Sequence, residues 1–170
     1  SLWRTVGQNR PAYAGYPRLV GETGGKDFVL AHQSADVDAL AVALVRGAFE
    51  YQGQKCSAAS RAYVPDTLWP AVRERVVAMM ADIRMGDVAD FRNFVGAVID
   101  KKGFDKIAEY IQTARKAKGV ELVAGGTADD AVGYFIEPTL LRADDPRYRT
   151  MCEEIFGPVL TLHVYPAARW

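Results

Sequence analysis

The chain has 170 residues, of which 49% are hydrophobic and 25% are charged, and 21 Lys and Arg residues balance 21 Asp and Glu residues. This composition is typical of a soluble, intracellular domain with its own core. The zero net charge argues against nucleic acid or an anionic membrane as partner and favours a small molecule. No apolar run approaches the ~20 residues that cross a bilayer, and two cysteines without CxxC or CxxH spacing predict neither a disulfide scaffold nor a metal site.

Strands and helices alternate in the first half of the chain. Residues 3–9 are compatible with a short helix, and the apolar run 27–32 predicts a short buried strand. Ser34 is a plausible N-cap for an apolar helix that Gly53 ends, because its hydrophobic residues recur at helical spacing. Residues 58–64 then predict a second strand.

The second half continues the alternation. Asp66 is a candidate cap for a helix that runs to about Ile83. Residues 86–99 predict a surface loop with Phe91, Phe94 and Val95 tucked beneath it. Asp100 is the N-cap candidate of a further helix, which Gly119 follows. Short strands are predicted at 120–124, 134–141 and 159–165. The whole pattern predicts an α/β fold with three layers, α/β/α, and a largely parallel sheet.

One stretch, from Phe49 to Arg61, has the residue types of a reactive site. Cys56 follows an apolar helix and Gly53, with Lys55 on one side and Ser57 on the other. A thiol at a sharp helix-to-strand exit is well placed to act as a nucleophile. Lys55 is a candidate for activating it, because the helix C-terminus disfavours a thiolate. The alternative is that Cys56 is a small buried hydrophobe, as free cysteines often are.

Two further stretches place carboxylates near glycine. Glu22 lies in Gly21-Glu22-Thr23-Gly24-Gly25-Lys26, where the glycines let the backbone approach a ligand closely. Glu153 and Glu154 precede Ile155-Phe156-Gly157-Pro158, which is either part of a site or an ordinary surface turn. No role in catalysis or metal binding is predicted for the remaining candidates His32, His163 and Cys152.

Residues 21–26, 53–57 and 153–159 resemble, in the same order, the signature blocks of the aldehyde dehydrogenase superfamily. The first two blocks are most similar to the branch that converts Δ1-pyrroline-5-carboxylate, as glutamate γ-semialdehyde, to glutamate with NAD in proline breakdown. The resemblance runs along the whole chain. It implies the fold of that family's catalytic domain, with residues 1–170 as a thiol-bearing fragment of it.

The resemblance also implies catalytic roles. Cys56 would attack the aldehyde carbon, and its backbone N–H would form half of the oxyanion hole. Glu22 would be the general base for the water that hydrolyses the thioester. Ser57 and Lys55 would contact the substrate.

The implied cofactor is NAD. Glu154 would accept hydrogen bonds from the nicotinamide ribose, Phe156 would pack near the same sugar, and Gly24 and Lys106 are further candidates for cofactor contact. The family's N-terminal cofactor domain and C-terminal segment have no counterpart in these residues. We therefore expect NAD to be bound mainly by that other domain, and the chain alone to be inactive.

The same resemblance implies an aldehyde as the small-molecule partner, a homo-oligomeric parent, and a location in a bacterial cytoplasm or the mitochondrial matrix. Two alternatives stay open. The substrate is another semialdehyde, with or without fusion of the parent to a proline-oxidising enzyme, or the chain is a non-catalytic module that keeps the fold.

Overall fold

A largely parallel sheet forms the centre of the computed structural model, which describes residues 1–22 and 24–170. Its strand order is β1-β2-β7-β6-β3. The first four of these are mutually parallel, and β3 runs antiparallel to β6, so the predicted largely parallel sheet is confirmed. The strands are β1 (Asp27–Leu30), β2 (Ala59–Pro65), β3 (Val120–Ala124), β6 (Thr139–Ala143) and β7 (Val159–Tyr165). The short strands β4 (Ala128–Asp129) and β5 (Phe135–Ile136) form a separate antiparallel pair.

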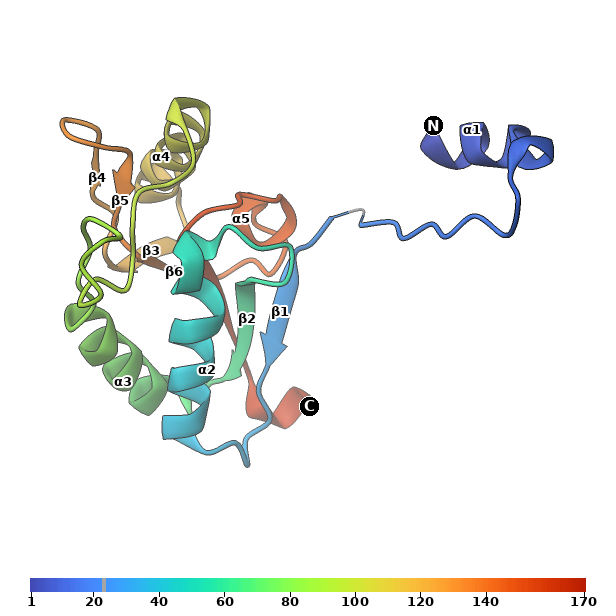
Figure 1. Cartoon of the computed structure of the whole chain (residues 1–170). Helices are drawn as coiled ribbons and strands as arrows, with labels where there is room; N and C mark the ends of the chain where they lie inside the picture. The colour runs from blue at the N-terminus through green and yellow to red at the C-terminus, as the bar shows by residue number, and fades with distance from the viewer. Residues whose placement is uncertain (23) are drawn as a thin grey trace.

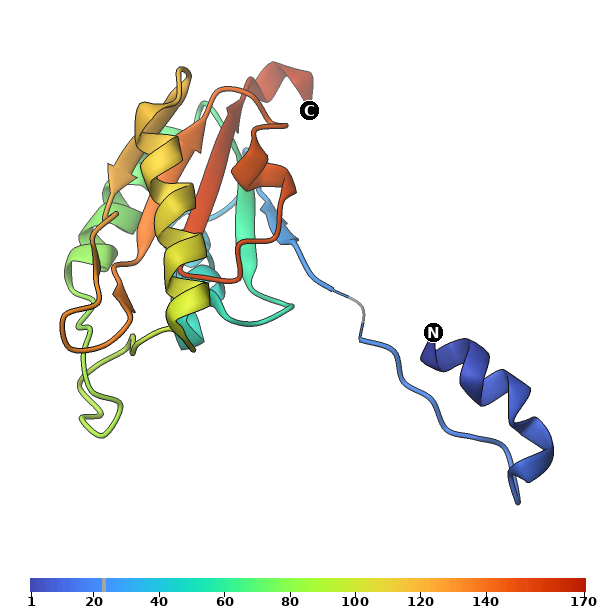
Figure 2. The same cartoon turned by 90° about the horizontal axis from the view of Figure 1, so that it is seen from above.

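Helices cover both faces of the sheet and give the predicted three layers (Figures 1 and 2). Two helices, α2 (Val37–Phe49) and α3 (Trp69–Ala81), pack on one face, and α4 (Lys101–Lys116) and the single turn α5 (Arg149–Cys152) lie on the other. Alternation along the strands divides the apolar residues accordingly. Leu140 and Leu160 join the core beneath α2 and α3, whereas Leu141 and Val159 join the core beneath α4.

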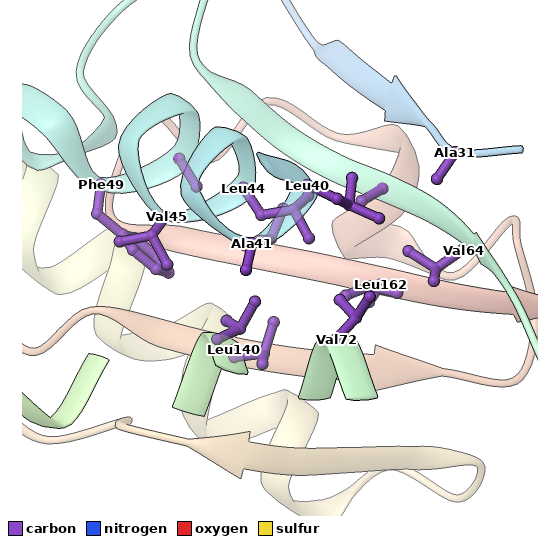
Figure 3. Packing of buried hydrophobic residues seen from close by; sticks show 14 residues of the cluster. Ala31, Leu40, Ala41, Leu44, Val45, Phe49, Val64, Val72, Leu140 and Leu162 are labelled. Atoms are coloured by element: carbon purple, nitrogen blue, oxygen red, sulfur yellow. The ribbon is translucent and has the colours of Figure 1, made fainter. Parts of the chain in front are cut away.

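The core beneath α2 and α3 is built from side chains that recur along α2 at helical spacing (Figure 3). Leu44 and Phe49 are completely buried there, in the same cluster as Val64 of β2 and Leu162 of β7. Each such side chain contributes about 1.5–3 kcal/mol through removal of apolar surface from water. This core fixes α2, and the loop that carries Cys56 begins directly after that helix.

The start of α2 differs from the prediction by two residues. Asp36, not Ser34, is the N-cap, and its carboxylate accepts a hydrogen bond from the N–H of Ala39 at 2.8 Å. The hydroxyl of Ser34 instead lies 2.9 Å from Nδ1 of His32. Both residue types cap helices well, so the sequence pattern alone did not separate them.

The two other predicted caps have opposite outcomes. Asp100 caps α4 as expected, accepting from the N–H of Gly103 at 2.7 Å. Asp66 does not cap α3, whose N-cap is Leu68. The carboxylate of Asp66 accepts instead from the N–H of Ala167, which begins the turn η3 (Ala167–Arg169) after β7.

Two predictions of burial were wrong. Strand β1 lies at the sheet edge, where Phe28 and Leu30 are 57% and 52% exposed. In the loop 86–99 the prediction was wrong for Phe91, which is 98% exposed, and confirmed for Phe94, which packs against the core, and for Val95, which is buried.

The first residues lie apart from the sheet (Figure 1). They form α1 (Leu2–Gln8) and the 3-10 turn η1 (Arg10–Ala12), and none of the residues in these two elements is buried. Of the helices in the described part of the chain, none is long and apolar enough to span a membrane.

Candidate active site

Each of the three motifs directly precedes one of three neighbouring parallel strands. Lys26 is followed by β1, Cys56 lies three residues before β2, and Glu154 lies five residues before β7. Because β1, β2 and β7 are adjacent and parallel, their amino ends meet at the same edge of the sheet. This shared edge brings together residues that are far apart in the sequence.

The loop that contains Glu22 touches the backbone of Cys56. A Cβ atom placed on Gly25 would lie 1.9 Å from the carbonyl oxygen of Cys56, so only glycine fits at this contact. Glu22 is three residues earlier, which places its Cα within about 11 Å of the Cα of Gly25. Gly24 has a φ of +145°, and Thr23 lies outside the described residues. The predicted nucleophile and the predicted base therefore belong to touching loops.

A second glycine contact joins the Cys56 loop to the Glu154 loop. Gly53 has a φ of +64°, and a Cβ on it would lie 2.4 Å from the carbonyl oxygen of Gly157. L-residues with side chains rarely adopt this backbone conformation, so glycine is needed here for both its conformation and its size. The three motifs thus meet through main-chain contacts, and we call this region the loop junction.

Cys56 occupies a tight turn between α2 and β2. The N–H of Ala58 donates to the carbonyl of Lys55 at 3.1 Å, which leaves Cys56 and Ser57 in the two central positions of the turn. Both side chains are exposed, so the alternative of a buried structural thiol is wrong. The helix-to-strand exit predicted for Cys56 is confirmed.

The backbone just before this turn is strained. In the 3-10 segment η2 (Glu50–Gly53), Tyr51 and Gln52 have φ values of 54° and 57°, in the left-handed region. Such conformations in non-glycine residues cost of order 1–3 kcal/mol and are concentrated at functional sites. Gln52 is buried, and its side-chain amide donates to the carbonyl of Ala97 at 3.1 Å, which holds the segment in place. Sequence reasoning missed this residue.

Lys55 is paired within the chain. Its ammonium lies 2.9 Å from Glu50, which also pairs with Arg46, and the hydrogen bond from Lys55 lowers the pKa of Glu50. The positive charge beside the thiol is therefore partly neutralised. The predicted contact of Lys55 with substrate stays a prediction.

The adjacent carboxylates Glu153 and Glu154 have different surroundings. Glu153 accepts a hydrogen bond from the hydroxyl of Tyr110 and pairs with Arg149 at 3.4 Å. The Tyr110 hydrogen bond is the main reason that the pKa of Glu153 is lowered and that the pKa of Tyr110 is raised. The guanidinium of Arg149 also lies 4.0 Å above the ring of Tyr110. Glu153 is thus engaged in holding α4 to α5.

Glu154 is not part of that pairing. Its Oε1 accepts from the N–H of Phe156 at 3.2 Å, and Lys106 of α4 donates to its backbone carbonyl at 2.6 Å. Phe156 has a φ of 62° and a side chain that is 44% exposed. A carboxylate beside an exposed aromatic ring fits a bound sugar, because carboxylates accept hydrogen bonds from hydroxyls and rings pack on apolar faces. Lys106 supports the main chain of this loop.

Two cationic residues next to the loop junction, Lys26 and Arg61, had no predicted role. Lys26 donates to the carbonyl of Thr150 at 2.7 Å, and Arg61 of β2 donates to the carbonyl of Met151 at 3.2 Å. Burial lowers the pKa of Lys26 from 10.5 to about 8, with Glu154 acting in the opposite direction. A cationic side chain within an otherwise apolar strand was the available signal for Arg61.

The remaining candidates, His163 and Cys152, lie outside the loop junction. Nδ1 of His163 lies 3.0 Å from the carbonyl of Ala143, and Cys152 is an exposed thiol at the end of α5. Residues 1–22 and 24–170 contain no cluster of His, Cys, Asp and Glu that could hold a metal ion. A hollow of about 500 Å³, lined by residues that include Met80, Ile83 and Pro138, includes no lining residue from the three motifs.

Comparisons with known proteins agree on one family. The sequence model described as the aldehyde dehydrogenase family matches residues 4–168. A curated relative, the mitochondrial delta-1-pyrroline-5-carboxylate dehydrogenase of Dictyostelium discoideum, is 52% identical over 93% of this chain and 28% of its own length. The human protein of the same name is 48% identical over 97% of this chain and 30% of its own length.

Solved structures give the same result for the fold. A delta-pyrroline-5-carboxylate dehydrogenase from Mycobacterium tuberculosis, bound with NAD and cobalamin, is 50% identical, with a TM-score of 0.86 over 99% of this chain and 31% of that one. A 1-pyrroline-5-carboxylate dehydrogenase from Thermus with bound NAD is 36% identical, with a TM-score of 0.79 over 85% of this chain and 28% of that one. The chain thus spans less than a third of the length of these relatives.

Proposed function

Because the chain belongs to the aldehyde dehydrogenase family, we propose that it is the thiol-bearing part of a larger NAD-dependent enzyme, here called the parent enzyme. The proposed reaction is oxidation of glutamate γ-semialdehyde, formed from Δ1-pyrroline-5-carboxylate, to glutamate in proline breakdown. The observation that carries the proposal is the loop junction, in which Gly25 packs on Cys56 and Gly53 packs on Gly157. In this proposal residues 1–170 are a fragment of the catalytic domain.

Cys56 is the proposed nucleophile. Its thiolate attacks the aldehyde carbon and forms a carbon–sulfur bond, which gives a thiohemiacetal. The bound cofactor supplies the acceptor for the hydride that leaves this carbon, and the product on Cys56 is a thioester. The exposed position of Cys56 in its turn supports this role, because an aldehyde can reach the sulfur from solvent.

Glu22 is the proposed general base. It takes a proton from a water molecule, the oxygen of that water attacks the thioester carbon, and the thiolate of Cys56 leaves with its electron pair. The product is the carboxylic acid. The contact between Gly25 and Cys56 supports this role, because it places the Glu22 loop beside the thioester position. Ser57, next to Cys56 in the turn, and Lys55 are proposed to contact the substrate.

NAD is the proposed cofactor, held by this chain at the Glu154 loop and mainly by other parts of the parent enzyme. Glu154 would accept hydrogen bonds from the nicotinamide ribose, with Phe156 beside the same sugar. Gly24, next to Gly25, and Lys106, which donates to the carbonyl of Glu154, are proposed to help position the cofactor. A homo-oligomeric parent is also proposed, in the mitochondrial matrix or in a bacterial cytoplasm according to its source.

The decisive experiment compares Cys56→Ser with Cys152→Ser in the parent enzyme, with NADH formation as the measurement. We expect Cys56→Ser to lower kcat/KM by at least about a thousandfold, because a serine hydroxyl is a much weaker nucleophile than a thiolate. Cys152→Ser removes the other exposed thiol, which is not part of the main-chain contacts of the loop junction, and should leave the rate nearly unchanged. Full activity in Cys56→Ser would falsify the proposed mechanism.

A second measurement tests the substrate. The ratio of kcat/KM for glutamate γ-semialdehyde to that for an unsubstituted aldehyde of equal chain length should favour the semialdehyde by a factor of about a hundred or more, because a site that binds a charged group rejects analogues without it. A ratio near one would reject this substrate and leave the general aldehyde dehydrogenase activity in place.

A further inference from the structure

The carbonyls at the end of α5 are held by side chains from two of the three motif-bearing segments. α5 is a single turn, Arg149–Cys152, so its last carbonyls have no following helical turn to bond them. Lys26 donates to the carbonyl of Thr150 at 2.7 Å, and Arg61 donates to the carbonyl of Met151 at 3.2 Å. Both contacts are charge-assisted hydrogen bonds, which are about twice as strong as neutral ones.

The positions of these residues in the chain give the contacts their importance. Lys26 follows Gly25, whose backbone touches Cys56, and Arg61 lies in β2, five residues after Cys56. The carbonyls that they hold come three and four residues before Glu154. The two cations therefore link the Glu22 loop and the Cys56 strand to the segment that leads into Glu154.

The backbone and the surroundings of Lys26 indicate a constrained residue. Its φ of +124° is rare for a residue with a side chain, and its amine is fixed by the hydrogen bond to Thr150. The titratable groups that act on its amine through space are Arg61 on β2, Cys152 on α5, and Glu153 and Glu154 after α5. Burial disfavours the protonated amine, and the negative charge of Glu154 favours it through space.

We propose that Lys26 and Arg61 are positioning residues that set the place of Glu154 relative to Glu22 and Cys56 by holding the end of α5. The inference deepens the proposed function and rests on it for its catalytic consequence. Neither cation reacts. Without the two hydrogen bonds, the segment 150–157 would move relative to Cys56, and the cofactor and substrate sides of the site would lose their alignment.

The first test measures amide hydrogen exchange of residues 150–157 in the full-length parent enzyme, with four variants: Lys26→Gln, Lys26→Arg, Arg61→Gln and Arg75→Gln. Arg75 is the matched control, since it pairs with Asp38 between α3 and α2, away from the loop junction. Lys26→Gln and Arg61→Gln should speed exchange in 150–157 about tenfold, as expected for loss of one charge-assisted hydrogen bond. Lys26→Arg keeps a cationic donor and should restore most of the protection.

The second test separates a positioning role from a merely structural one by steady-state kinetics. Lys26→Gln should raise the KM for NAD by about tenfold while the amplitude of the first turnover, which reports thioester formation at Cys56, is kept. Arg75→Gln should change neither value.

Three results would overturn the inference. Exchange in 150–157 that is unchanged in Lys26→Gln would show that the hydrogen bonds do not hold this segment. Faster exchange throughout the protein, or faster local exchange with an unchanged KM for NAD, would reduce the contacts to structural ones. A wild-type parent that does not oxidise the semialdehyde would reject the proposed function, whereas the exchange measurement would still decide whether the cations hold α5.

Discussion

The core beneath α2 and α3 and the loop junction are built in different ways. In the core, side chains such as Leu44 and Leu140 fill the space between helix and sheet and are completely buried. At the junction, main chain touches main chain, and neither Gly25 nor Gly53 has room for a Cβ. The difference teaches that stability depends on side-chain volume in one region, whereas alignment of the site depends on the absence of side chains in the other.

The largest effect is expected from removing volume in the core. Leu44→Ala should lower the free energy of unfolding by about 3–5 kcal/mol, because the loss of buried methyl groups and the cavity left behind both destabilise. Val42→Ala, on the exposed side of the same helix, should change it by less than about 0.5 kcal/mol. Urea denaturation of both variants gives the comparison. Equal losses would mean that α2 is not held by this core.

Adding one methyl group at the loop junction should lower activity more than stability. Gly25→Ala forces its loop away from Cys56, and we expect a loss of about a hundredfold in thioester hydrolysis by the parent enzyme, since a shift of about 1 Å at a reacting group has this effect. The loss of stability should be smaller than in Leu44→Ala. Gly7→Ala in α1 is the control, because its new methyl group has open space. Hydrolysis at the wild-type rate in Gly25→Ala would break the comparison.

The two adjacent glutamates test the junction at finer resolution. Glu154→Gln should raise the KM for NAD about tenfold, as expected for loss of hydrogen bonds to a charged acceptor, with little change in stability. Glu153→Gln should lower the midpoint of urea unfolding, because it weakens the contacts with Tyr110 and Arg149, and should leave the KM nearly unchanged. Initial-rate kinetics and unfolding curves measure both. If Glu153→Gln raised the KM and Glu154→Gln lowered stability, the roles given to these two residues would have to be exchanged.

The last expected effect is a pH dependence of stability from Lys26. Its pKa of about 8 in the folded protein lies below the ordinary 10.5, so the unfolded chain binds more protons between these values. The contribution of Lys26 to the free energy of unfolding therefore rises as pH increases from about 8 to 10.5, and below pH 8 the cost of burying the charge is fully present. Lys26→Met removes this titration. The free energy of unfolding of the wild type, relative to that of Lys26→Met, should increase as pH rises through that window. It should stay constant between pH 6 and 7.

Features with local signals were predicted well from the sequence. Asp100 caps α4 as predicted because an N-cap acceptor acts on its immediate neighbours, whereas the helix ends two residues before the predicted Gly119, at the extended C-cap Ala117. The apolar run 159–165 became the central strand β7, and the helix-to-strand exit at Cys56 was found because Gly53 ends the preceding segment.

Features that depend on distant segments could not be read in this way. The run that forms β1 is as apolar as a buried strand, and its exposure depends on which helices reach that edge. The contact of Lys26 with Thr150 joins positions 124 residues apart. The left-handed backbone of Tyr51 and Gln52 is imposed by tertiary contacts, because neither residue favours it.

The adjacency of β2 and β7 has a consequence for how such a protein can change over time. Residues 66–158 connect β2 to its neighbour β7, and they contribute β6 and β3 on the other side of β7. The surface of this connection can be lengthened or changed in sequence, for example by a reporter peptide inserted beside the exposed Phe91. The spacing of the loops that carry Glu22, Cys56 and Glu154 would stay constant. Surface diversification and preservation of the chemistry are therefore separable in this architecture.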